Sequence, residues 1–139
     1  MQSNPVENIV CLVDSDIAID FLRKREYARK LFEHWVNEGL LAISTITHLE
    51  IYQGMKPDEE IRTNIFLDGF ITVSVDIYIS RLAGRMLGKL RSRGITVGIA
   101  DAIIGATALT LGAPLLTNNI DHYPFDDLNV IQGSDKQKQ

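Results

Sequence analysis

Short apolar runs alternate along the chain with longer stretches in which apolar residues recur every three or four positions. Strands that alternate with helices favour repeated strand–helix units, so this pattern predicts an α/β fold with a parallel sheet. The runs predict strands over residues 9–13, 40–43, 71–75, 114–117 and 128–131. The periodic stretches predict helices over residues 15–24, 26–37, 44–55, 57–67, 76–90 and 99–111.

Polar residues mark where these elements begin. Ser15 and Asp76 stand where a side chain can cap the following helix. No internal repeat and no linker rich in Gly, Ser or Pro separates the elements. We therefore expect one domain over residues 1–139, with an ordered core over about 8–132 and a disordered tail over 133–139.

The helix expected after Asp76 carries cations along one stripe. Arg81, Arg85 and Lys89 follow one another at four-residue spacing, which places them on the same side of a helix. Such a stripe is typical of a solvated helix face, since cations are favoured near a helix C-terminus. An edge that contacts phosphate groups or a partner protein is the alternative interpretation.

Composition restricts the class of protein without selecting a function. The chain has 139 residues, 45% of them hydrophobic, which is enough to bury a core without disulfides or structural zinc. The one cysteine, Cys11, cannot form an intramolecular disulfide, and no signal-peptide pattern is visible, so we expect a cytoplasmic protein. The formal net charge of -4 gives no overall attraction to nucleic acid, so any phosphate-binding surface has to be a local patch.

Four acidic side chains stand beside apolar runs, where a charge needs compensation. Asp101 is the one charged residue within the apolar stretch 95–116. An aspartate at the centre of a membrane-spanning helix costs roughly 2.5 to 3.5 kcal/mol, so we expect a buried helix and a strand there, and no membrane span. Asp14 and Asp16 directly follow the first strand, and Glu50 lies in a mostly apolar helix. If the fold brings these carboxylates together, their repulsion favours a divalent cation.

Three of these acids also have a local explanation. Asp14 can be an ordinary turn or cap residue, and Asp16 is explained by the dipole of the helix that it begins. Glu50 closes the pattern Thr47-x-x-Glu50, which matches a capping box.

Several other chemistries lack their sequence patterns. The chain has no glycine-rich phosphate loop and no Gly-x-Ser-x-Gly turn. His34, His48 and His122 are too scattered for a recognisable zinc site, so we interpret each as a surface or core residue.

Four segments, taken in order, resemble the PIN-domain family, and more narrowly the VapC-type toxins of bacterial and archaeal toxin–antitoxin pairs. The resemblance spans roughly residues 9 to 131. The segments are Leu12-Val-Asp14-Ser-Asp16, Ser44-Thr-Ile-Thr-His-Leu-Glu50-Ile-Tyr-Gln-Gly54, Gly98-Ile-Ala-Asp101-Ala-Ile-Ile-Gly-Ala-Thr-Ala108, and Leu116-Thr117-Asn-Asn119 with Asp121-His-Tyr123.

This resemblance implies a three-layer α/β/α sandwich with a central parallel sheet. It also implies a cytoplasmic ribonuclease that depends on Mg²⁺ or Mn²⁺, acts on RNA, forms a homodimer and is inhibited by a small antitoxin protein. By matching position, Asp14 and Asp101 would bind the metal directly, and Glu50 would bind a second ion or position the water. The resemblance favours Asn119 over Asp121 for the fourth position. The hydroxyls of Ser15 and Thr117 would line the same groove.

Two other functions remain open at this level. Val13-Asp14-Ser-Asp16 is similar to the opening motif of haloacid-dehalogenase-like phosphatases, in which Asp14 would be the nucleophile and Asp16 an acid/base. That family needs a later lysine, and none lies between Gly94 and Gly133. The second alternative is an inactive PIN-like module that works by binding another protein.

Overall fold

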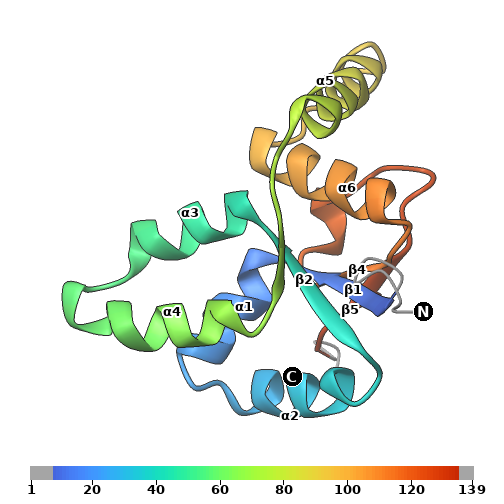
Figure 1. Ribbon diagram of the computed structural model, residues 1–139. Helices are drawn as coiled ribbons and strands as arrows, with labels where there is room; N and C mark the ends of the chain where they lie inside the picture. The colour runs from blue at the N-terminus through green and yellow to red at the C-terminus, as the bar shows by residue number, and fades with distance from the viewer. Residues whose placement is uncertain (1–7, 135–139) are drawn as a thin grey trace, which may run out of the picture.

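The computed structural model describes residues 8–134, and its centre is a five-stranded sheet in the order β3-β2-β1-β4-β5 (Figure 1). All four neighbouring pairs are parallel. The strands are β1 (Ile9–Val13), β2 (Leu40–Ser44), β3 (Ile71–Val73), β4 (Leu115–Thr117) and β5 (Val130–Gln132). Successive parallel strands need a crossover, and the helices supply it.

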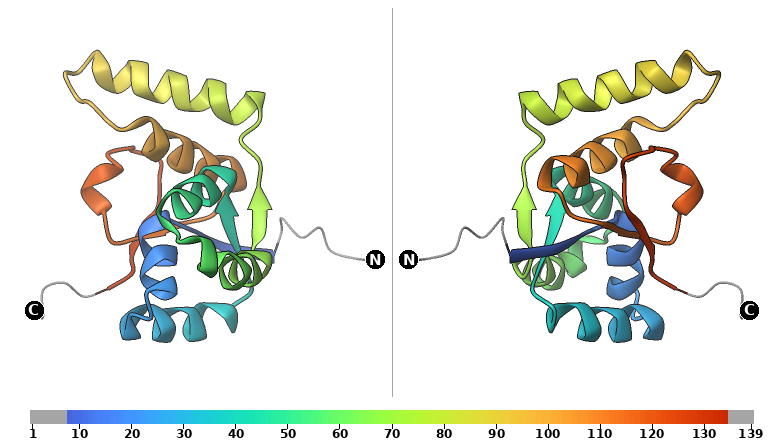
Figure 2. Two further views of the ribbon diagram at one scale, coloured as in Figure 1. Left: turned by 90° about the vertical axis from the view of Figure 1, so that its left-hand side faces the viewer. Right: turned by 90° about the vertical axis from the view of Figure 1, so that its right-hand side faces the viewer.

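Helices cover both faces of this sheet, which makes a three-layer α/β/α sandwich (Figure 2). They are α1 (Ser15–Leu22), α2 (Glu26–Val36), α3 (Thr45–Gly54), α4 (Glu60–Asp68), α5 (Ile77–Arg91) and α6 (Ile99–Leu111), with short 3-10 turns at Pro57–Glu59 and Ile120–His122. Side chains alternate across β1. Cys11 and Val13 pack with Ile17 of α1 on one face, whereas Leu12 packs with Ile104 of α6 on the other. Burial on both faces explains why the strand reads as a continuous apolar run.

Helix α5 lies outside the sandwich, packed on α6. Ile79 and Ala83 of α5 are buried against Ala102 and Ala106 of α6. Figure 2 draws α5 across the top of the molecule, with α6 between it and the sheet. The solvated face expected for α5 is confirmed, because its cations are exposed: Arg81, Arg85 and Lys89.

The predicted element order is confirmed, and the main differences lie at element ends. Asp76 caps α5 as expected, since its Oδ1 accepts the Ile79 amide at 2.8 Å. The expected cap of α1 is wrong: the Asp14 carboxylate accepts the Ser15 amide, so Ser15 is the first helical residue. β3 ends at Val73, two residues early, because the Val75 amide donates to the Thr45 hydroxyl at 3.2 Å.

Two residues of the expected tail, Gly133 and Ser134, form hydrogen bonds to the end of β4 and the loop after it. Gly133 donates its amide to the carbonyl of Thr117 at 3.0 Å, and the amide of Ser134 donates to Asn118 Oδ1 at 2.7 Å. The remainder of the expected tail, residues 135–139, lies outside the described residues. Within the described range, no helix combines the length and apolar content needed to span a bilayer.

Candidate active site

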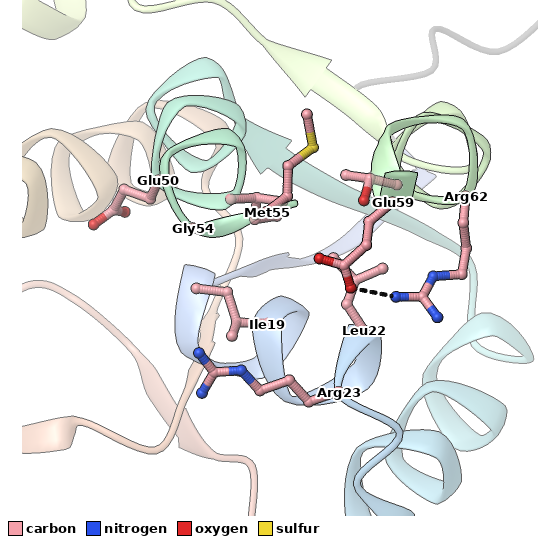
Figure 3. Close-up of a pocket in the computed structure, with 10 residues that line it drawn as sticks. Ile19, Leu22, Arg23, Glu50, Gly54, Met55, Glu59 and Arg62 are labelled. Carbon is pink, nitrogen blue, oxygen red and sulfur yellow. Dashed lines mark hydrogen bonds and ion pairs between the residues drawn. The ribbon is translucent and has the colours of Figure 1, made fainter. Parts of the chain in front are cut away.

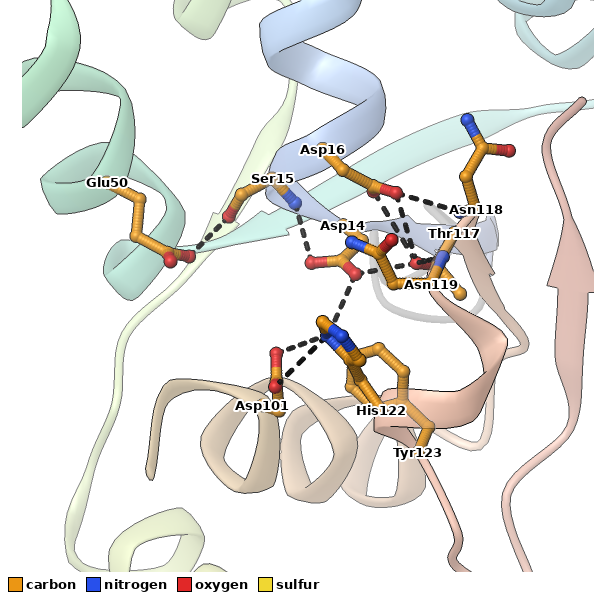
Figure 4. A network of polar contacts seen from close by, with 10 residues as sticks. All are labelled: Asp14, Ser15, Asp16, Glu50, Asp101, Thr117, Asn118, Asn119, His122 and Tyr123. Atoms are coloured by element: carbon orange, nitrogen blue, oxygen red, sulfur yellow. Dashed lines mark hydrogen bonds and ion pairs between the residues drawn. The ribbon is translucent and has the colours of Figure 1, made fainter. Parts of the chain in front are cut away.

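The acidic residues gather where the carboxyl ends of β1 and β4 meet the first turns of α1 and α6 (Figure 4). In the order β3-β2-β1-β4-β5, the chain reverses direction across the sheet between β1 and β4. Open α/β sheets bind ligands at such a reversal, outside the carboxyl ends of the strands. The topology therefore places the acids at the preferred ligand position of the fold.

Asp14 is the buried centre of this network, with 5% of its surface exposed. Its Oδ2 accepts hydrogen bonds from the hydroxyls of Thr117 at 2.7 Å and Tyr123 at 2.8 Å, while Oδ1 accepts the Ser15 amide at 2.7 Å. Burial raises the pKa of the Asp14 carboxyl, the three donors oppose that rise, and the nearby Asp101 adds to it. The carboxylate is thus held in position by neutral donors.

Asp101 meets Asp14 through one hydroxyl group. The Tyr123 hydroxyl, which bonds to Asp14, also lies 3.3 Å from Asp101 Oδ1. Burial, with the nearby charge and bond of Asp14 as further causes, raises the pKa of Tyr123, so the phenol stays protonated and can donate. His122 Nδ1 lies 3.5 Å from Asp101 Oδ2, and His122 is exposed, in agreement with its interpretation as a surface residue.

Glu50 belongs to the same site but does not touch the other acids. The Ser15 hydroxyl lies 2.6 Å from Glu50 Oε1 and 3.0 Å from the Thr47 hydroxyl. The capping-box interpretation of Thr47 and Glu50 is wrong, because Ser44 caps α3 by accepting the Ile46 amide at 3.1 Å. Glu50 therefore lies in the second turn of α3, directed at the start of α1.

Asp16 is also a member of the network, although its position at the start of a helix does not reveal this role. Its Oδ2 accepts the Asn118 amide at 2.9 Å, and both of its carboxylate oxygens lie 3.5 Å from the Thr117 hydroxyl. Burial, with the neighbouring charge of Asp14 as the next cause, raises the pKa of Asp16 to about 6. A residue that only interacted with a helix dipole would have its pKa lowered, so the dipole does not explain Asp16 fully.

The two candidates for the fourth position differ in their surroundings. The backbone amide of Asn119 donates to the Thr117 hydroxyl at 3.0 Å, and the same hydroxyl donates to Asp14 at 2.7 Å, so Asn119 and Asp14 share a hydrogen-bond partner. Asp121 is exposed on the 3-10 turn Ile120–His122. The hydroxyls of Thr117 and Ser15 are each bonded to an acid of the network.

The donors of this site fit a small divalent cation in charge and chemistry. Among residues 8–134, no lysine or arginine forms an ion pair with Asp14, Asp16, Glu50 or Asp101, and His122 is the one cationic candidate. No group of three or more His, Cys, Asp or Glu side chains in that range is placed to hold one ion together. Mg²⁺ is commonly bound by one or two carboxylates and several waters, and Asp14 with Asp101 matches that pattern.

A partly apolar groove borders the acids on the side of Glu50 (Figure 3). It lies between α1 and the segment from α3 to α4, and Arg23 and Arg62 stand at its rim. Arg62 is bonded to Glu59 at 3.0 Å, whereas Arg23 has no ion pair within the described residues. The apolar side chains that line this groove are Ile19, Leu22, Ile51 and Met55.

Removing the hydroxyl of Tyr123 should destabilise the metal-free protein. The hydroxyl donates to a buried carboxylate, and such a bond is worth about 1.5 kcal/mol or more. We expect Tyr123→Phe to lower the free energy of unfolding by about 1.5 kcal/mol, measured by urea denaturation at pH 7 in EDTA. Tyr78→Phe is the control, because Tyr78 is 59% exposed. Equal stability of the Tyr123→Phe variant and the wild type would refute the bridging role.

The PIN domain family model matches residues 11–128, so the chain belongs to this family. The chain is similar to a Mycobacterium tuberculosis protein named ribonuclease VapC19, with 33% identity over 119 residues that cover 84% of this chain and 95% of the relative. Another protein of that organism, ribonuclease VapC10, is 34% identical over 114 residues, which cover 82% of this chain and 86% of the relative.

Solved structures give the same fold. A chain of a toxin–antitoxin complex from Klebsiella pneumoniae superposes with a TM-score of 0.77 at 27% identity, covering 90% of this chain and 98% of that one. A chain of the DNA-bound VapBC complex from Salmonella typhimurium has a TM-score of 0.80 at 20% identity, covering 91% and 99%, which supports the fold alone. Because the chain belongs to the PIN domain family, we reject the phosphatase alternative, in which Asp14 would be the nucleophile.

Proposed function

We propose that the protein is a metal-dependent endoribonuclease that hydrolyses RNA phosphodiester bonds and acts as the toxin of a toxin–antitoxin pair. The observation that carries the proposal is the buried Asp14 carboxylate, which neutral donors hold beside Asp101 at the ligand-binding edge of the sheet. The names of the relatives VapC19 and VapC10 supply the reaction class.

Different residues of the chain would have different roles in such a hydrolysis. Asp14 and Asp101 would hold Mg²⁺ or Mn²⁺, which when bound lowers the pKa of an attacking water and neutralises charge developing on the phosphate. Tyr123 and Thr117 fix the orientation of the Asp14 carboxylate through their hydroxyls. Correct positioning of the reacting groups can lower the activation barrier substantially. We therefore expect these two hydrogen bonds to affect the rate of hydrolysis.

Two further side chains would act on the substrate side of the acids. Glu50, held by the Ser15 hydroxyl, is placed to orient a water or to bind a second ion. Asn119, whose backbone amide is bonded to Thr117, has a side-chain amide that would bind a phosphate oxygen or orient a water. Attack by water on phosphorus would break the bond to the 3′-oxygen, which takes up a proton, and so leave a 5′-phosphate and a 3′-hydroxyl.

The partners follow from the same proposal. The Klebsiella and Salmonella neighbours are chains of toxin–antitoxin complexes, so we propose a small antitoxin as the inhibitor of this chain. We assign to the antitoxin the groove lined by Ile19, Leu22, Ile51 and Met55, because it borders Glu50 and offers apolar side chains to a partner. We also propose that the protein is cytoplasmic and forms a homodimer.

Incubation of the purified protein with total RNA tests the reaction. Cleavage should occur with Mn²⁺ or Mg²⁺, stop on addition of EDTA and resume when the ion is restored in excess. Sequencing of the fragment ends should find 5′-phosphates. Cleavage that persists in EDTA, or fragments with 2′,3′-cyclic phosphates, would contradict the mechanism.

A further inference from the structure

We propose that the hollow between the acids and α2 binds the single-stranded RNA segment that flanks the scissile phosphate. This inference rests on the proposed ribonuclease function and adds the path of the substrate. The hollow begins at Asp16, Asn118 and Asn119 and runs to α2, where Arg25, Lys30 and His34 line it. It is separate from the groove that borders Glu50, since the residues lining the two do not overlap.

The cations of this hollow are available to a ligand. Arg25, Lys30 and His34 are exposed, and none of them forms an ion pair in the described part of the chain. Arg29 of the same helix differs, because its guanidinium is paired with Glu26 and Glu33. The N-cap residue Arg25 and Lys30 of α2 therefore line the hollow without forming an ion pair, whereas Arg29 is paired.

One acid of the hollow lies at the active site, and the other lies beside α2. Asp16 belongs to the acidic network, and Asp20 accepts a hydrogen bond from the Tyr27 hydroxyl. The same Tyr27 hydroxyl accepts a bond from Asn118 Nδ2 at 2.8 Å, which ties α2 to the loop after β4. A phosphate chain whose scissile group lies at the acids thus finds its next positive contacts on α2. Such an arrangement suits a polyanion that continues in one direction from the reacting phosphate.

The second basic surface of the protein is less well placed. The stripe of Arg81, Arg85 and Lys89 lies on α5, and α6 separates α5 from the sheet (Figure 2). Charge alone would give RNA two possible surfaces, and continuity with the acids selects the hollow on α2. A single strand fits better than a duplex, because sequence-specific recognition of RNA uses unstacked bases and a groove that follows one backbone.

A matched pair of double variants tests the inference. Arg25→Ala with Lys30→Ala should raise KM for a single-stranded RNA substrate about 10-fold at ~0.1 M salt, with kcat changed less than about 2-fold. The slope of log(kcat/KM) against log salt should fall by about 1.4, because each phosphate contact to single-stranded nucleic acid contributes about 0.7. Arg81→Ala with Arg85→Ala removes the same two charges from α5 and should leave KM and the slope unchanged.

Three results would overturn the inference. Unchanged KM in the α2 double variant is the first, and an equal rise in the α5 double variant is the second. The third is a loss of antitoxin binding by the α2 variant while RNA cleavage stays normal, which would mean that the hollow binds a protein and not RNA. If the wild type does not cleave RNA at all, the proposed function fails. Fluorescence anisotropy with a labelled RNA strand then decides the inference by itself, because only the α2 variant should bind about 10-fold more weakly.

Discussion

Asp14→Asn should reduce RNA cleavage by about 1000-fold or more and abolish growth inhibition. The substitution keeps the shape of the side chain and its ability to accept the Ser15 amide, so α1 keeps its cap. It removes the charge that the proposed ion requires, and loss of several kcal/mol of transition-state stabilisation corresponds to that factor. Single-turnover cleavage of a defined RNA with Mn²⁺ measures the effect.

The controls for Asp14→Asn separate an enzyme from a binding module. Asp127→Asn removes an exposed charge outside the network and should cleave at the wild-type rate. The Asp14→Asn variant should still bind the antitoxin, since the groove lined by Ile19 and Met55 is untouched. If Asp14→Asn retains growth inhibition and cleavage, the protein is an inactive PIN-like module or cuts RNA by other residues.

The layers of the fold could be predicted because burial on both faces leaves a plain signal. β1 and α6 are apolar almost throughout, and each was located to the residue at both ends. Asp101 stood out for the same reason, as the one charge in an apolar helix. The end of β3 could not be found, because it depends on a bond between Val75 and Thr45, which are 30 residues apart in the chain.

The site contacts that the sequence does not reveal share one cause, which is that they join residues far apart in the chain. Tyr123 reaches Asp14 across 109 positions of sequence, and nothing near it distinguishes it from a core tyrosine. Asp16 follows a strand and begins a helix, so a local rule explained it and the Asn118 amide was not foreseen. Arg25 and Lys30, at the start of α2 and within it, have acidic residues nearby in the sequence. Only the structure shows which cations of this segment form ion pairs and which do not. Local sequence patterns therefore reveal residues that are unusual at their position. They miss the tertiary role of residues that also have an ordinary local explanation.

Asp16→Asn should stabilise the metal-free protein at neutral pH. The folded-state pKa of Asp16 is raised from 3.8 to about 6 by burial and the neighbouring Asp14. The folded state therefore binds the proton more tightly than the unfolded state, and stability falls as pH rises from about 4 to about 6. Asparagine does not titrate, and its Oδ1 can still accept the Asn118 amide. With the partial exposure of Asp16 taken into account, we expect a gain on the order of 2 kcal/mol at pH 7.

The pH dependence of this gain identifies its cause. Urea denaturation in EDTA should show the Asp16→Asn variant and the wild type equal near pH 4, with the difference growing up to about pH 6 and constant above it. Asp127→Asn, at an exposed position, should show no such profile. A gain that is the same at every pH would mean that packing, and not the charge, is responsible. The expected profile would mean that the fold tolerates an unfavourable carboxylate beside Asp14, which is the arrangement that a cation-binding site requires.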